Sequence, residues 1–192
     1  MNYQVIFSGV MLVAFAACVF VKATMMRRRG VRAMVQGRPE KGELLLPVFV
    51  IALLYAALAR PLGLPMWDAL VRPFWAAAGP GWAGLALCGL ALAGFILSLI
   101  SFGDSFRVGI DEKAPSELVT GGMFAISRNP VYLCFLLLFA GLFLIHRNLL
   151  ILIATVFFAA MIHRQILREE AFLKKRHGEE FEDYCKRVRR YI

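Results

Sequence analysis

Residues 116–132, SELVTGGMFAISRNPVY, form a polar segment that decides how the C-terminal half of the chain folds. An apolar run begins directly after it. Asn129 can act as the N-cap of a helix, and Pro130 suits the first helical position because it has no N–H to leave unpaired. The segment predicts a helix that begins at a membrane surface, where its free N–H groups and positive dipole end favour an anion. The alternative is that Asn129 and Pro130 only cap the helix, and that Tyr132 only lies in the interfacial aromatic belt.

The composition outside this segment is that of a membrane protein. Of the 192 residues, 60% are hydrophobic and 18% charged, which is not typical of a soluble globular protein. We expect a single integral-membrane domain over residues 1–192, an all-α polytopic bundle of about five transmembrane helices. The expected spans are residues 3–23, 44–59, 84–102, 131–145 and 149–162. The last two are short for crossing a bilayer, so they either extend into polar turns or form a tight hairpin in a thinned membrane.

The C-terminal residues are expected to form a helical cap in the cytoplasm. No Gly or Pro occurs at residues 149–177, which predicts one continuous helix of roughly 40 Å or more that leaves the bilayer. Gly178 is expected to end it, and residues 179–183 to open a last short helix. The apolar positions of that helix predict packing on the domain or the membrane in preference to binding; they are Phe181, Tyr184, Cys185 and Val188. Residues 1–102 then provide the N-terminal spans, and residues 103–192 a core with the candidate site.

The distribution of positive charge predicts the orientation in the membrane. The segments expected on the inner side contain 19 of the 22 Lys and Arg residues, and the outer segments contain only Arg60, Arg72 and Arg147. The net charge of +9 is therefore interpreted as orientation and attraction to anionic lipid headgroups, not as a nucleic-acid-binding surface. We expect a multi-pass protein of the plasma or inner membrane, with its site at the cytoplasmic face.

The cysteines and histidines give neither a disulfide pattern nor a metal site. The cysteines show no CxxC and no paired spacing, and the histidines are not spaced as metal ligands. They are Cys18, Cys88, Cys134, Cys185, His146, His163 and His177. We expect no bound metal.

A second polar cluster lies where the long helix leaves the membrane. Residues 164–170 read RQILREE, so Arg164 and Arg168 share one helix face, and Gln165 and Glu169 share another. The alternative is a solvated helix end stabilised by salt bridges. Because this cluster is expected at the same membrane depth as Asn129, on a helix adjacent in sequence, we predict that the two polar clusters form a site.

Several motifs in order resemble one family of membrane enzymes. RNPVY, preceded by SELVTGGMFAIS and followed about forty residues later by REEAFLKKRHGEEFEDYCKRV, resembles the isoprenylcysteine carboxyl methyltransferase family and related membrane methyltransferases, including those that act on phospholipid headgroups. The resemblance covers about residues 103–192. It implies S-adenosylmethionine as cofactor, held at the cytoplasmic face, and a lipophilic or lipid substrate that arrives from the bilayer.

The resemblance also implies roles for individual residues. Leu118, Val119 and Phe124 would line the adenosine pocket. Asn129, Pro130 and Tyr132 would meet the cofactor near the helix start, and Glu169 would hold its amine or ribose. The candidate catalytic residues are Arg164, Arg168 and Glu170.

Two positions depart from the isoprenylcysteine enzymes. Asn129 stands where they usually have His, and Gln165 stands where they often carry a substrate-binding Arg. We therefore expect Arg164 or Arg168, not Gln165, to orient an anionic group beside Glu169; the alternative for both arginines is lipid headgroup anchoring. These departures weaken the case for a prenylcysteine carboxylate as substrate, and they leave methyl transfer itself unaffected.

Methyl transfer from a sulfonium needs little acid–base catalysis, because in-line placement and exclusion of water supply most of the effect. The absence of an evident catalytic base is thus compatible with an enzyme. Two other functions remain open. One is a membrane lipid or sterol-type reductase using NADPH, in which Arg164 and Arg168 pair with phosphates, and the other is a non-catalytic membrane subunit. The sequence leaves the substrate and its nucleophile open.

Overall fold

The computed structural model describes residues 3–28, 55, 62–65, 67–103 and 118–192. The regular elements within these ranges are all helical: α1 (Tyr3–Arg28), α3 (Asp68–Val71), α4 (Gly79–Phe102), the 3-10 helix η2 (Gly122–Ala125), α5 (Pro130–His146), α6 (Leu149–His177) and α7 (Glu179–Arg187). Helices α1, α4 and α6 are long and apolar enough to cross a membrane, and α5 is a shorter apolar helix. The predicted all-α membrane bundle is confirmed. The expected span at 44–59 lies outside the described residues except for Tyr55, so the number of five spans stays a prediction.

The ends of the helices in the C-terminal half follow from local sequence signals. Helix α5 begins at Pro130, as predicted, with Asn129 at its N-cap position. Helix α6 runs without interruption for 29 residues, roughly 44 Å, and ends at Gly178, whose φ of +54° is readily adopted only by glycine. The predicted continuous helix and its glycine stop are both confirmed.

The prediction that the Asn129 side chain caps α5 is wrong in one respect. That side chain accepts no hydrogen bond from the helix, and its Nδ2 instead donates to the carbonyl of Arg190 at 3.1 Å. The backbone angles of Asn129, φ −131° and ψ 53°, are not those of an extended N-cap. Asn148 is the residue that caps a helix here, since its Oδ1 accepts from the backbone N–H of Ile151 at 2.9 Å.

Helices α4 and α5 approach closely through glycine. A Cβ built on Gly84 would lie 2.6 Å from the carbonyl oxygen of Gly141, and a Cβ on Gly94 would lie 3.0 Å from Cys134 Sγ. Gly89, on the same helix, faces open space. The absence of side chains at Gly84 and Gly94 therefore allows close packing, and at Gly84 a side chain would meet backbone and push the two helices apart.

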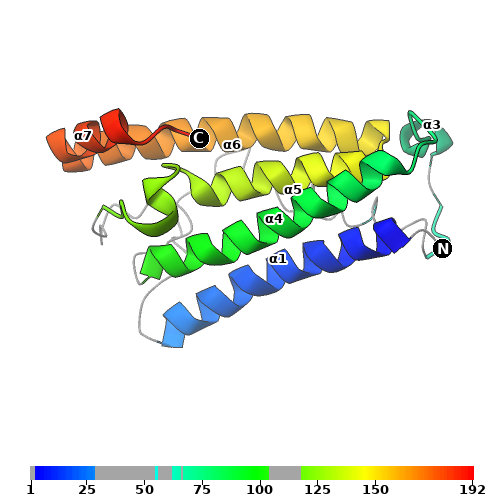
Figure 1. Cartoon of the computed structure of the whole chain (residues 1–192), viewed down its shortest axis with the longest axis horizontal. Coiled ribbons are helices and arrows are strands. Elements are labelled where there is room, and N and C mark those ends of the chain that lie inside the picture. The colour runs from blue at the N-terminus through cyan, green and yellow to red at the C-terminus, as the bar shows by residue number, and fades with distance from the viewer. Residues whose placement is uncertain (1–2, 29–54, 56–61, 66, 104–117) are drawn as a thin grey trace.

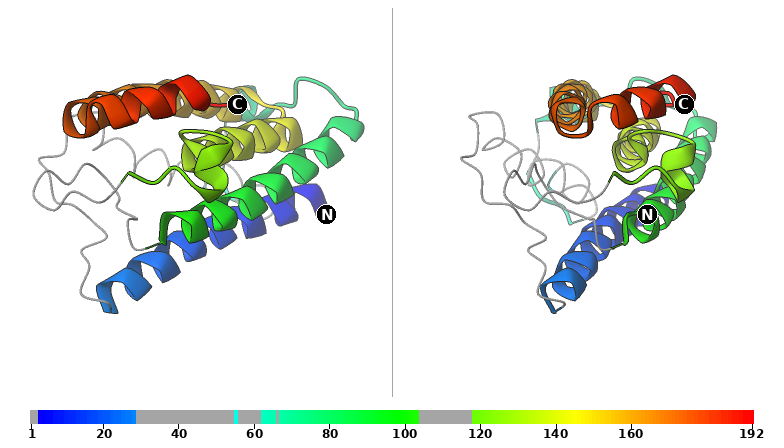
Figure 2. Two further views of the ribbon diagram at one scale, coloured as in Figure 1. Left: turned by 60° about the vertical axis from the view of Figure 1, so that its left-hand side comes forward. Right: turned by 90° about the vertical axis from the view of Figure 1, so that its left-hand side faces the viewer.

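The helices bring the polar segments together at one end of the bundle. Helices α1 and α4 run in the same direction, α5 runs in the opposite direction, and α7 folds back beside the end of α6 (Figures 1 and 2). The start of α5, the polar end of α6, η2 and α7 therefore lie at one end, whereas α3 and the start of α1 lie at the other. At that other end the buried hydroxyl of Ser8 lies 3.0 Å from His146 Nε2, which joins α1 to the end of α5.

Candidate functional site

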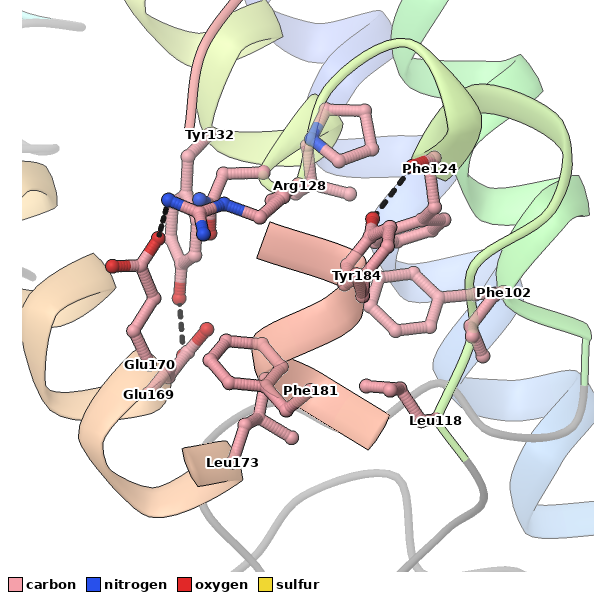
Figure 3. Close-up of a pocket in the computed structure, with 14 residues that line it drawn as sticks. Phe102, Leu118, Phe124, Arg128, Tyr132, Glu169, Glu170, Leu173, Phe181 and Tyr184 are labelled. Atoms are coloured by element: carbon pink, nitrogen blue, oxygen red, sulfur yellow. Dashed lines mark hydrogen bonds and ion pairs between the residues drawn. The ribbon is translucent and has the colours of Figure 1, made fainter. Parts of the chain in front are cut away.

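A cavity of about 120 Å³ lies where α4, η2, α5, α6 and α7 meet. It is lined by residues from all five elements and from the segments before η2 and α5 (Figure 3). They are Phe102, Leu118, Val119, Phe124, Arg128, Asn129, Pro130, Val131, Tyr132, Glu169, Glu170, Leu173, Phe181 and Tyr184. The lining combines an aromatic wall with one cation and two carboxylates.

Glu169 is held by donors from two helices. The hydroxyl of Tyr132, in the first turn of α5, donates to Glu169 Oε1 at 2.5 Å, and Gln165 Nε2 donates to the same oxygen at 2.9 Å. Gln165 lies one turn before Glu169 on α6, so the two side chains share a helix face. With one oxygen held twice, the carboxylate is fixed in orientation and its remaining acceptor positions can receive ligand N–H or O–H groups.

Glu170 joins two arginines that are distant in sequence. Arg128 contacts its Oε1 at 3.1 Å, and Arg190 binds it through Nε at 3.0 and 3.1 Å and through a terminal nitrogen at 2.7 Å. The side chains of Arg128 and Glu170 are only 13% and 14% exposed. A buried carboxylate is tolerated when it is paired and hydrogen-bonded, as here. The triad leaves one net positive charge at this wall of the cavity.

The opposite wall is aromatic. Phe102 and Phe124 make an edge-to-face contact, with ring centroids 4.6 Å apart and planes at 74°. The hydroxyl of Tyr184, on α7, donates to the carbonyl of Phe124 at 2.6 Å and so ties η2 to α7. Burial raises the pKa of Tyr184 to about 12, so this hydroxyl keeps its proton at neutral pH. Figure 3 shows Phe181 beside these rings, and the wall can accept a flat ring system.

Glycine positions η2 against α4. Gly122 has a φ of +60°, and a Cβ there would meet the side chain of Ser101, whose hydroxyl accepts from the backbone N–H of Met123 at 3.1 Å. The Gly121-Gly122 pair thus lets the chain turn tightly over the end of α4. Phe124 is directed into the cavity as a result.

The start of α5 gives the cavity a positive end. Asn129 and Pro130 line it, and the backbone N–H groups of the first helical turn have no partner within the helix. Arg128 Nε is buried and has no hydrogen-bond partner within the part of the chain that the structure describes. An anionic ligand group at this position would meet both a helix N-terminus and a guanidinium.

The structure brings most of the sequence-predicted residues together. Eight of them line the cavity: Leu118, Val119, Phe124, Asn129, Pro130, Tyr132, Glu169 and Glu170. Arg164 is exposed, and neither Arg164 nor Arg168 belongs to the lining. It is Gln165 that contacts Glu169. The predicted role of the two arginines in orienting a ligand anion stays a prediction.

Other lining residues were not expected from the sequence. They are Phe102, Arg128, Val131, Leu173, Phe181 and Tyr184. A signal existed for Leu173, because the i, i+4 series Gln165, Glu169, Leu173 follows one face of α6. Phe181 and Tyr184 were expected only to pack, and they do pack with Val188 in a small core, but they also form the cavity wall.

Within the described parts of the chain, no group of three or more His, Cys, Asp or Glu residues could hold a metal ion. The profile of the phospholipid methyltransferase family matches residues 81–180. This range is more than half of the chain and runs from the first turn of α4 into α7, including RNPVY and the Glu169–Glu170 pair. No curated protein matches the sequence significantly.

Proposed function

The chain belongs to the phospholipid methyltransferase family, in the group of membrane methyltransferases that resemble isoprenylcysteine carboxyl methyltransferase, and from this premise we propose its activity. We propose that it is an integral-membrane methyltransferase that uses S-adenosylmethionine and acts on a lipophilic or amphiphilic substrate at the cytoplasmic membrane face. Family membership confirms the resemblance found in the motifs. The observation that carries the proposal is the cavity in which a fixed carboxylate, Glu169, faces an aromatic wall and the start of α5.

The chemistry of the lining fits this cofactor. Glu169 suits the ammonium group or the ribose hydroxyls, because a carboxylate accepts charge-assisted hydrogen bonds. Arg128 Nε, which has no hydrogen-bond partner among the described residues, and the N-terminus of α5 suit the carboxylate. Phe102, Phe124 and Phe181 suit the adenine ring. The cavity volume of about 120 Å³ is below the roughly 300–1,000 Å³ typical of small-molecule sites, so we expect the lining to open on binding.

The residues of this chain contribute placement and exclusion of water. The cofactor, when bound, supplies an electrophilic methyl group on a sulfonium. Glu169, held by Tyr132 and Gln165, orients a ligand without reorganising its own hydrogen bonds. The apolar side chains around it, including Leu118 and Leu173, keep water from the reacting atoms. Since the cavity lies at the end of apolar helices, a substrate with an apolar tail can reach it from the membrane.

Calorimetry in detergent with S-adenosylhomocysteine tests the proposal. We expect the wild-type protein to bind, and Glu169→Gln to weaken binding about ten- to a hundred-fold, because a hydrogen bond to a charged group contributes roughly 1.5–3 kcal/mol. Glu179→Gln is the matched control, since Glu179 is exposed at the start of α7 and lies outside the cavity lining. Failure of folded wild-type protein to bind, or equal binding by Glu169→Gln, would contradict the proposal.

Two further measurements test the alternative functions, a reductase and a non-catalytic membrane subunit. Binding of NADPH in place of S-adenosylhomocysteine would identify a reductase. Stable copurification of a second protein, with neither compound bound, would identify a non-catalytic subunit. Lipid extract incubated with cofactor carrying a labelled methyl group, followed by mass spectrometry of the labelled product, identifies the substrate.

A further inference from the structure

The C-terminal tail, residues 188–192, lies against the segment that begins α5. The carbonyl of Arg189 accepts the backbone N–H of Arg128 at 3.0 Å. The carbonyl of Arg190 accepts from Asn129 Nδ2 at 3.1 Å and from the hydroxyl of Ser127 at 3.3 Å. Tyr191 reaches α6, where its hydroxyl lies 2.8 Å from His163 Nδ1. The tail is thus tied to both helices that carry the polar side of the cavity.

The side chain of Arg190 extends this connection to the cavity wall. It binds Glu170 through two nitrogens, and Glu170 in turn contacts Arg128, which lines the cavity. Arg190 is 36% exposed at its side chain, whereas the other two side chains are far more buried. Arg190 is therefore the more exposed end of a chain of ion pairs whose other two members, Glu170 and Arg128, are largely buried.

Arg128 and Arg190 would affect the binding of an anionic ligand in different ways. Glu170 carries one negative charge and is shared between two positive charges, so Arg128 is not fully neutralised by it. Arg128 also keeps a buried Nε without a hydrogen-bond partner among the described residues. If Arg190 were absent, Glu170 would be paired with Arg128 alone. The attraction of Arg128 for a ligand anion would then fall, and Glu170, which contacts Arg128, would have lost its second partner.

We propose that Arg190 is a positioning residue of the cofactor site: by sharing Glu170 it holds Arg128 in place with a free N–H for the anionic end of the cofactor. The inference rests on the proposed function and extends it beyond the part of the chain that the family profile matches, which ends at residue 180. The tail is in this view part of the binding site, and Arg190 acts through Glu170 without contacting the ligand.

The test compares two neighbouring arginines in the full-length protein. Arg190→Ala removes the contact with Glu170, and Arg189→Ala removes the same charge from an exposed side chain while leaving its backbone carbonyl in place. By calorimetry with S-adenosylhomocysteine in detergent, we expect Arg190→Ala to weaken binding roughly ten-fold or more and Arg189→Ala to bind as wild type. Arg190→Lys should restore part of the affinity, because it returns the charge without the bidentate geometry.

A double variant distinguishes positioning through Glu170 from a general loss of structure. If Arg190 acts through Glu170, Arg190→Ala combined with Glu170→Gln should bind no more weakly than Glu170→Gln alone, whereas independent effects would multiply. Wild-type affinity in Arg190→Ala, or fully multiplicative effects in the double variant, would overturn the inference. Should Arg190→Ala not fold, Arg190→Gln is judged by the same outcomes. If folded wild-type protein binds no S-adenosylhomocysteine, the proposed function is itself overturned, and this inference with it.

Discussion

Neighbouring residues at the polar end of α6 differ in what their side chains contact, according to the helix face they occupy. Glu169 lines the cavity and Gln165, one turn before it, donates to its carboxylate, whereas Arg164 and Arg168 belong neither to the cavity lining nor to that hydrogen bond. One residue corresponds to a rotation of about 100° on a helix, which is enough to move a side chain from the site to its surroundings. The choice between catalysis and anchoring for the two arginines is therefore open to a direct measurement.

Substitution of the two arginines separates these roles by magnitude. A lost contact to a reacting anion reduces turnover about ten- to a hundred-fold, whereas a lost lipid headgroup contact costs about 1 kcal/mol of membrane attraction and leaves turnover nearly intact. A labelled-methyl assay of Arg164→Ala and Arg168→Ala decides between the two roles, although neither side chain lines the cavity: the sequence-based prediction requires a loss of turnover in at least one variant, and near wild-type turnover in both would show that both arginines are anchors. A ten-fold or larger loss in either variant would show that it orients the substrate or cofactor.

Removal of the Tyr184 hydroxyl is expected to lower the stability of the protein. Tyr184→Phe removes the 2.6 Å hydrogen bond to the carbonyl of Phe124 and leaves that acceptor without this donor, so we expect the free energy of unfolding to fall by about 1–3 kcal/mol. Thermal unfolding in detergent measures the change, and Tyr3→Phe, at a side chain 68% exposed, is the control. Equal unfolding temperatures for the two variants would contradict the prediction.

The same side chain has a pH dependence. Burial raises the pKa of Tyr184 from about 10 to about 12, so the folded state holds this proton more tightly than the unfolded state. Its contribution to stability is fully present below about pH 10 and is lost as the pH rises toward 12. Tyr184→Phe should therefore lose less stability than wild type across this interval.

At the scale of elements, the backbones of α4 and α5 approach closely where Gly84 meets Gly141. A Cβ on Gly84 would meet the backbone of Gly141, which cannot move aside as the end of a flexible side chain can. We expect Gly84→Ala to lower the free energy of unfolding by about 1–3 kcal/mol, the usual cost of overpacking. Gly89→Ala is the matched control on the same helix, because nothing lies within 4 Å of its Cβ position. If both variants unfold at the same temperature, the glycine contact does not limit the packing of these helices.

For the whole molecule, the orientation in the membrane is the main prediction. Helix α1 ends on the side of the cavity, and α3 lies at the opposite end of the bundle (Figure 1). From the distribution of positive charge we predict that the cavity end lies in the cytoplasm. Reporter fusions after Gln36 and at Ile192 should both give cytoplasmic signals. A periplasmic or luminal signal at either position would refute the charge-based orientation.

The class of fold, the helix boundaries at Pro130 and Gly178 and most of the cavity lining could be predicted from the sequence, whereas α1 and α4 extend beyond the expected spans of 3–23 and 84–102. Local backbone chemistry explains the start of α5 at Pro130, the end of α6 before Gly178 and the uninterrupted length of α6. Such features can be predicted without knowledge of tertiary contacts. The predicted convergence of residues 118–132 with Glu169 could be argued because the two segments adjoin through one helix hairpin. These features depend on neighbours close in the chain.

The partners of the polar side chains, in contrast, depend on the tertiary packing. Asn129 donates to Arg190 instead of capping α5, and Arg128 meets Arg190 across Glu170, contacts between residues separated by 20 to 61 positions in the chain. Such contacts depend on how α7 folds back along α6, because that packing brings the tail to the start of α5. No local pattern encodes it, since the same arginine near a helix end would equally suit solvent or a lipid headgroup.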